Sequence, residues 1–286
     1  MMERRIRRKK IDIQKENDNL IMQSKLQFFT DISHEIRTPL TLILSPIEAL
    51  IKETPEGPLQ NVYKMINQNG QRILRLINQV MEMRKLDRGQ VRLLTVPTDV
   101  DSFFRAIASS FDNIAEEKHI QFEIHVEPGL PTVWIDQEKL DKVVFNVLSN
   151  AFKYTPEGGK VTIEIGKDGG DLKIRIADSG EGVPAEQREL IFNRFYQIPT
   201  KNNRNKMGTG IGLHLSRSLM EIHHGRIYVE DSSAGGAVFV VTLPLNNDYL
   251  KKEEMQTEAS EDSLATLVQP ALQDFVEEVQ ELSLIH

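Results

Sequence analysis

A regular apolar repeat in the first third of this 286-residue chain sets strict limits on how it can fold. Eight residues follow one another at spacings of 3, 4, 3, 4, 3, 4 and 3, namely Leu59, Val62, Ile66, Asn69, Ile73, Leu76, Val80 and Met83. This heptad pattern predicts a helix that packs along one seam, where the single polar member can fix the register. The pattern of residues 25–52 predicts a second helix, joined to the first by a turn at residues 54–58. Because two helices cannot bury both seams alone, we expect a dimer that forms a four-helix bundle.

Charge is unevenly distributed along the chain, whose formal net charge is −7. Residues 1–10 hold six Arg/Lys and one Glu, whereas residues 247–286 hold ten Asp/Glu and two Lys. The basic start lacks interleaved aromatic residues, so it fits a juxtamembrane segment on the cytoplasmic side better than nucleic-acid binding. There is no cysteine, and no apolar run reaches the roughly 18–20 residues that cross a bilayer. We therefore expect a portion of the chain on the cytoplasmic side of a membrane, with any membrane span outside this sequence.

Four segments follow from these patterns. Residues 1–24 predict a signalling coiled coil, residues 25–90 the dimerising helices, residues 91–245 a second domain and residues 246–286 an acidic linker or tail. The second domain is predicted to contain helices at residues 100–118, 136–154, 185–192 and 211–223, and strands at residues 121–126, 133–135, 161–166, 172–178, 226–230 and 237–245. This order indicates an α/β domain with helices on one face of a mixed sheet.

The segment at residues 29–40 places a histidine on the outward face of the first helix. Apolar residues at spacings of 3 and 4 form the packing face, while His34 and, one turn later, Thr38 lie outside it. A neutral imidazole is a competent nucleophile near pH 7, and the neighbouring carboxylate of Glu35 can take up its proton. An isolated His–Glu pair on a helix is more often an ordinary exposed surface, so the surrounding string decides the interpretation.

The helix at residues 136–154 carries a polar stripe beside its apolar face. Asn146, Asn150 and Lys153 recur at i, i+4 and i+7, and therefore share one surface. Amide oxygens can bind Mg²⁺, which takes phosphate oxygens for its remaining ligands, and the lysine can meet a phosphate. A single asparagine in a helix is usually only solvated, whereas this trio forms one polar surface.

Two glycine motifs follow further along the chain. Asp178, Gly180 and Gly182 leave a predicted strand, where a carboxylate can accept a hydrogen bond from an adenine amine and glycines permit close approach of the backbone. The second motif opens a helix, whose N-terminal amides can bind phosphate. It consists of Gly208, Thr209, Gly210, Ile211, Gly212 and Leu213. It is neither a P-loop nor the dinucleotide fingerprint, because its glycine spacing differs from both.

Together these motifs resemble the five boxes of the sensor histidine kinases, over about residues 20–245. The string Ser33–Leu40 resembles the phosphoacceptor box, and four further segments resemble the N, G1, F and G2 boxes in that order: Asn146–Thr155, Asp178–Pro184, Ile191–Tyr196 and Gly208–Leu213. The resemblance implies a dimeric helical hairpin followed by an α/β sandwich of the gyrase/Hsp90/histidine-kinase type. It also implies an ATP-dependent protein histidine autokinase of a two-component system. Pro46 further resembles what hybrid sensor kinases carry.

The resemblance also implies roles for individual residues. His34 would take the γ-phosphoryl group of ATP, Glu35 would accept the proton, and Thr38 with Glu35 would place a water for dephosphorylating a response regulator. Asn146 and Asn150 would hold Mg²⁺, Asp178 would bind adenine, and further nucleotide contacts would come from Lys153, Tyr154, Gly180, Gly182, Arg194 and Gly208–Leu213. The expected partners are a second copy of the chain and the receiver domain of a response regulator, with no nucleic acid.

Two interpretations from other classes remain open. An ATP-driven conformational machine of the gyrase or chaperone kind would share the ATP fold but would give His34 no role. A non-catalytic dimeric interaction module would show degraded ATP motifs, whereas Asn146, Asn150, Asp178 and the three glycines of the last motif are intact.

Overall fold

The computed structural model describes residues 36–37, 39–55, 57–198, 209–230, 232 and 235–256. They fall into two compact units that divide between Gln90 and Val91, and each unit is described here by itself. Over these described ranges, no helix combines the length and the apolar character that a membrane span requires.

The first unit is an antiparallel helical hairpin. Residues 36–37 and 39–53 are helical, and α2 (Pro58–Asp87) returns beside them. Arg37 Nη2 donates to Asn78 Oδ1 at 2.8 Å, and Gln71 Nε2 donates to Glu48 Oε1 at 3.2 Å. The first contact joins the start of the first helix to the later part of α2. The second joins the end of the first helix to the first half of α2. The predicted hairpin and its turn are therefore present in the described residues.

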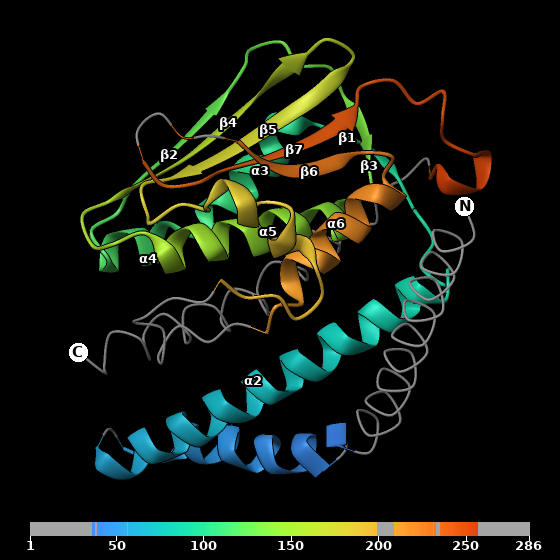
Figure 1. The fold of residues 1–286 in the computed structure, drawn as a ribbon. Coiled ribbons are helices and arrows are strands. Elements are labelled where there is room, and N and C mark those ends of the chain that lie inside the picture. The colour runs from blue at the N-terminus through green and yellow to red at the C-terminus, as the bar shows by residue number, and fades with distance from the viewer. Residues whose placement is uncertain are drawn as a thin grey trace, which may run out of the picture. The chain divides into compact units, whose positions relative to one another are not determined.

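The second unit is built on a mixed five-stranded sheet with the order β2-β4-β5-β7-β6. Its strands are β2 (Gln121–Val126), β4 (Lys160–Asp168), β5 (Asp171–Asp178), β6 (Arg226–Glu230) and β7 (Val238–Pro244). The pair β2–β4 is parallel, whereas the other neighbours are antiparallel. Helices α3 to α6 lie on one side of this sheet (Figure 1). The expected fold class, a helical hairpin followed by an α/β sandwich, is confirmed.

The core lies between the sheet and these helices. Along β4 and β5 buried residues alternate with more exposed ones, so that Ile163 and Ile176 face inward with 0% of their surface exposed. Opposite them lies α5 (Gln137–Tyr154), whose apolar face includes the fully buried Val144 and Leu148. The helix begins where Asp136 Oδ1 accepts a hydrogen bond from Lys139 N at 3.2 Å. A carboxylate cap of this kind satisfies a free amide of the first turn.

The predicted helix at residues 100–118 is wrong, because the structure divides it into α3 (Val100–Ser109) and α4 (Asp112–Glu117). The chain turns at Phe111, which is fully buried. Its ring stacks on Phe152 with centroids 5.3 Å apart and lies 5.2 Å from the ring of Phe145. These ring contacts hold Phe111 in the core at the point where α3 ends and α4 begins.

Two shorter segments also differ from expectation. The predicted helix at residues 185–192 is a pair of 3-10 turns, η1 (Ala185–Gln187) and η2 (Leu190–Phe192). The strand β1 (Val96–Thr98), which was not among the predicted strands, pairs antiparallel with β3 (Val133–Ile135). The remaining helix, α6 (Gly212–Ile222), lies within its predicted range.

Residues beyond the last strand fold back onto the start of the second unit. Thr95 N donates to Glu254 O at 2.6 Å, and Gln256 N donates to Thr95 O at 2.8 Å. Thr95 itself is fully buried, and the short turn η3 (Lys252–Glu254) precedes this contact. The ring of Tyr249 lies 4.9 Å from the ring of His224. Part of the expected acidic tail is thus an ordered strap on this unit.

Candidate functional site

The polar stripe of α5 lies beside the start of α6. Asn146 Nδ2 donates to Ser216 Oγ at 2.9 Å, which joins the two helices. Asn150 is half-buried, and its side chain makes no hydrogen bond to another described residue. Lys153 Nζ lies 5.8 Å from the ring centroid of Tyr154, which is 36% exposed. The helix therefore presents amide groups and one ammonium group along a single surface.

Asp178 ends β5 and is almost buried, with 8% of its surface exposed. Its Oδ1 accepts hydrogen bonds from Gly180 N at 2.8 Å and Ala237 N at 3.3 Å. Burial raises the pKa of this carboxyl, and the two backbone hydrogen bonds only partly oppose the effect. Its Oδ2 accepts no hydrogen bond from a described residue, so this oxygen can receive a donor from a ligand.

The glycines that follow Asp178 are required by close backbone packing. A Cβ on Gly180 would lie 2.6 Å from Tyr154 O, and a Cβ on Gly182, whose φ is +75°, would lie 2.6 Å from Gly236 O. Real Cβ atoms essentially never approach so closely. The turn after β5 is therefore pressed against the end of α5 and the loop that precedes β7, which fixes Asp178 in place.

The second glycine motif meets the asparagine stripe at the start of α6. A Cβ on Gly212 would collide with the Asn146 side-chain amide, so this glycine lets α6 approach α5. Gly210 has φ +68°, and Phe195 N donates to its carbonyl at 2.8 Å. Ile211 N donates to Thr209 Oγ1 at 3.2 Å, while the Ile211 side chain is buried. The following Leu213 is half-buried at the start of α6.

Arg194 is held by a histidine that the motifs did not single out. Arg194 Nε donates to His214 Nε2 at 2.8 Å, and His214 Nδ1 lies 3.1 Å from Phe192 O. Because Nε2 is an acceptor, the imidazole is neutral with its hydrogen on Nδ1, which donates to Phe192 O. Arg217 adds a second contact, with its guanidinium carbon 4.1 Å from the Phe192 ring centroid. The F-box segment is thereby attached to α6.

The described residues include only part of the expected site. His34, Glu35, Thr38 and Gly208 lie outside the described residues. Asn146 of the N box contacts Gly212 of the G2 box. Asp178 lies in the same unit, at the end of β5. Sequence reasoning missed Ser216 and His214. Both lie on α6, at i+4 and i+2 from Gly212, and their roles depend on partners elsewhere in the chain.

The donor set fits a nucleotide with a hard cation. The described residues contain no group of three or more His, Cys, Asp or Glu side chains that could hold a metal ion. Asn146 uses its Nδ2 toward Ser216 and keeps Oδ1, and the amide of Asn150 is uncommitted among the described residues. Mg²⁺ accepts a few protein oxygens and completes its shell with phosphate oxygens and water. Two amide oxygens beside a glycine-rich helix start match that requirement.

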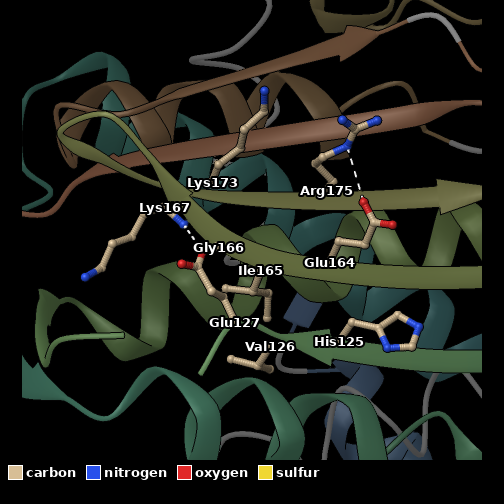
Figure 2. A pocket seen from close by; sticks show the side chains of 9 residues that line it. All are labelled: His125, Val126, Glu127, Glu164, Ile165, Gly166, Lys167, Lys173 and Arg175. Atoms are coloured by element: carbon tan, nitrogen blue, oxygen red, sulfur yellow. Dashed lines mark hydrogen bonds and ion pairs between the residues drawn. The ribbon is translucent and has the colours of Figure 1, made fainter. Parts of the chain in front are cut away.

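A separate hollow of about 420 Å³ lies on the outer face of the sheet, over β2, β4 and β5 (Figure 2). Lys173 and Arg175 line it, and they alternate along β5 with buried isoleucines, so they point away from the helices. Lys173 Nζ lies 3.2 Å from Asp168 Oδ2, and Arg175 Nε lies 3.6 Å from Glu164 Oε2. Because carboxylates already offset these cations, we assign the hollow to the charged outer surface rather than to nucleotide binding.

Two family profiles match the chain. The His Kinase A (phospho-acceptor) domain matches residues 24–89. The histidine kinase-, DNA gyrase B-, and HSP90-like ATPase matches residues 135–247. The first covers the helical hairpin, and the second covers α5, α6 and the strands β4 to β7.

Known proteins that are similar to this chain include histidine kinases. Histidine kinase P4 of Formosa agariphila is 35% identical over 291 residues, which cover 96% of this chain and 21% of that protein. Sensor histidine kinase TmoS of Ectopseudomonas mendocina is 38% identical over 226 residues, which cover 78% of this chain and 23% of that protein. The solved structure of full-length ShkA in complex with AMPPNP is 29% identical with a TM-score of 0.65, over 76% of this chain and 45% of that one. The chain therefore spans about a fifth of the length of these two curated relatives.

The fold and the site define the second unit as an ATP-binding domain of the α/β sandwich type. The hairpin before it matches a phosphoacceptor domain. The chain belongs to the sensor histidine kinases and carries the two domains of their kinase core.

Proposed function

We propose that this chain is an ATP-dependent autokinase that phosphorylates His34 and passes the phosphoryl group to an aspartate of a response-regulator receiver domain. The observation that carries the proposal is the meeting of the asparagine stripe with the glycine motif, where Asn146 contacts Gly212 and Ser216. Asp178 supplies a buried acceptor at the end of the neighbouring strand. The same unit thus offers separate groups for the base and for the phosphates of ATP.

In the proposed reaction, an imidazole nitrogen of His34 attacks the γ-phosphorus of ATP. The new N–P bond replaces the bond to the bridging oxygen, ADP leaves, and Glu35 accepts the imidazole proton. Asn146 and Asn150 would hold Mg²⁺ through amide oxygens, and the bound ion would supply positive charge that offsets the charge on the phosphates. Lys153 and the amides around Gly210 bind phosphate oxygens, while Asp178 accepts from the adenine amine and Gly180, Gly182 and Tyr154 form its surroundings. Arg194, which His214 orients, faces the phosphates from the F box.

After autophosphorylation, phosphohistidine donates its phosphoryl group to a receiver aspartate, which regenerates the free imidazole. Thr38 and Glu35 place a water for the reverse function, dephosphorylation of that aspartyl phosphate. The basic residues 1–10 are proposed to follow a membrane segment, so that the kinase core works on the cytoplasmic side. We propose the segments 1–24, 25–90, 91–245 and 246–286 as signalling helix, phosphotransfer domain, catalytic domain and linker.

The hairpin supports the proposed homodimer. Among the described residues of the first unit, nine large apolar side chains are exposed, namely Ile36, Leu42, Ile43, Leu50, Leu59, Val62, Met65, Ile66 and Ile73. Four of them belong to the predicted seam, and Leu42 is 70% exposed. Apolar side chains exposed in this number along one helical hairpin support an interaction surface. We expect light scattering to give twice the chain mass of 32.7 kDa, and a monomer at micromolar concentration would contradict the bundle.

The decisive measurement is transfer of label from γ-labelled ATP with Mg²⁺ to the parent protein and to two variants, His34→Ala and Asn150→Ala. We expect label that is acid-labile and base-stable in the parent and absent from both variants. His34→Ala should still bind ATP, because that residue lies outside the ATP-binding unit. Label that persists in His34→Ala would contradict the assigned phosphoacceptor, and undiminished ATP turnover in that variant would favour an ATP-driven conformational machine.

A further inference from the structure

A short connection joins the two units. Helix α2 ends in a capped turn, in which Gln90 N donates to Lys85 O at 2.9 Å. The next residue along the chain with a main-chain hydrogen bond is Leu94, whose N donates to Asp136 Oδ2 at 2.9 Å. Residues 91–93 make no hydrogen bond to another described residue, and we call them the connector. Hydrogen bonds therefore hold the connector only at its two ends.

The strap, residues 246–256, binds the chain directly after the connector. Thr95 is fully buried, and three hydrogen bonds join it to the strap. Its N and Oγ1 both donate to Glu254 O, at 2.6 and 2.8 Å, and its O accepts from Gln256 N at 2.8 Å. Met255, between these two partners, forms a parallel bridge with Thr95. Because the next residue begins β1, which pairs with β3, the strap adds a third strand beside the start of β1.

The strand β1 is too short to fix the end of the connector without the strap. It pairs with β3 through three residues, and an isolated pair of strands is marginally stable in water. One side-chain contact, from Asp136 to Leu94 N, would remain beside this pair. If both were lost, the next capped position would be Asp99, whose Oδ1 accepts from Ser102 N at 2.8 Å at the start of α3. The connector would then extend over residues 91–98.

We propose that the strap keeps the connector short and thereby increases the rate at which the ATP-binding unit phosphorylates His34. The effect on this rate rests on the proposed function. The effective concentration of one tethered unit near another falls as roughly the −3/2 power of the length of a flexible connection. Extension from residues 91–93 to residues 91–98 corresponds to a rate that is lower by up to roughly fourfold. Affinity for nucleotide should not change, because the strap contacts Thr95 and His224, which lie outside the ATP motifs.

A proline in place of Gln256 disrupts the strap contact with little other change. Proline has no N–H, so Gln256→Pro removes the hydrogen bond to Thr95 O. Met255 already has the extended backbone that a following proline requires, with φ −104° and ψ 120°. Lys252→Pro is the matched control, because its N–H, at the first residue of η3, bonds to no described residue and Lys251 is extended with ψ 151°.

Thr95→Val is a second strap variant, which removes only the hydrogen bond from Oγ1 to Glu254 O. In the full-length chain, each variant loses one hydrogen bond, so amide hydrogen exchange in peptides that cover residues 91–98 should be about 2- to 12-fold faster than in the parent. The initial rate of His34 labelling with γ-labelled ATP and Mg²⁺ should fall roughly 2- to 4-fold. Calorimetric affinity for ADP should be the same in all proteins, and Lys252→Pro should match the parent in every measurement.

The exchange measurement does not depend on His34, so this inference and the proposed function can fail separately. Unchanged exchange of residues 91–98 in both strap variants would overturn the inference. Faster exchange together with labelling at or above the rate of the parent would also overturn it, because the strap would then stabilise the unit without promoting phosphorylation. A parent that never labels His34, but whose exchange responds as expected, would refute the autokinase and support the role of the strap in keeping the connector short.

Discussion

Replacement of Asp178 by asparagine should separate nucleotide recognition from the stability of the fold. Asp178 Oδ1 accepts from two backbone amides, and an asparagine oxygen can replace it in both contacts. The other position changes from an acceptor to an NH₂ donor, which would face the donating amine of adenine. A hydrogen bond to a charged group contributes about 1.5–3 kcal/mol. Its loss in the variant corresponds to a dissociation constant for ADP that is roughly 10- to 150-fold higher.

Stability should move in the opposite direction in this variant. Burial raises the pKa of Asp178 above its value in the unfolded chain. A carboxyl of this kind destabilises the folded state progressively as the pH rises from the unfolded pKa through the folded pKa, and the penalty is absent below the unfolded pKa. Because the penalty grows as the pH rises above the unfolded pKa, its removal in Asp178→Asn should leave the free energy of unfolding at pH 7.5 equal to or higher than that of the parent.

Calorimetric titration with ADP and urea denaturation at pH 7.5 measure the two effects on one sample. Asp171→Asn, at the exposed start of the same strand, is the matched control and should change neither quantity substantially. An Asp178→Asn protein that binds ADP like the parent would refute the adenine role. A variant that loses both affinity and stability would show instead that the carboxylate charge is needed to hold the turn.

Three further predictions concern other parts of the second unit. Gly212→Ala should weaken nucleotide binding at least tenfold through its collision with the α5 amide, whereas Gly170→Ala, which has open space around its Cβ, should leave ADP titration unchanged. Burial raises the pKa of Asp141 from 3.8 to about 6, so Asp141→Asn should gain up to about 3 kcal/mol in urea denaturation at pH 8 and nothing below pH 3.8. Truncation after Leu245 removes the strap and should cost about 1–3 kcal/mol relative to truncation after Gln256, through two lost backbone hydrogen bonds, which urea denaturation measures.

Local sequence patterns were sufficient to predict those helices and strands whose ends are set by residues nearby in the chain. The strands at residues 121–126, 133–135 and 226–230 have the predicted bounds, and α5 begins after its aspartate cap as expected. The break at Phe111 could not be predicted in this way, because it depends on a ring contact with Phe152, 41 positions later in the chain. The same reason explains why β1 was missed, since its partner β3 lies more than 30 residues away.

The site shows the same division between local and distant causes. The motif positions of Asn146, Asp178 and Gly212 could be read from spacing, and the structure places them in one unit. Ser216 and His214 became candidates only when their partners were known, because a serine or a histidine on an amphipathic helix carries no distinctive local signal. Their partners lie 70 and 20 residues away in the chain.

The glycines of the site illustrate how one residue type can meet two requirements. The sequence suggested that Gly180 and Gly182 leave room for a bound base. In the structure, the space of a Cβ at either position is already closed by the protein backbone, at Tyr154 O and Gly236 O. A substitution there would therefore displace the turn that carries Asp178 even before any ligand is bound. On α6, by contrast, the space beside Gly212 is filled by the Asn146 amide, which donates to Ser216 Oγ at 2.9 Å. The proposed adenine side is thus held by backbone packing, whereas the proposed phosphate side depends on a side-chain contact. Substitutions on the two sides should therefore separate effects on folding from effects on nucleotide binding.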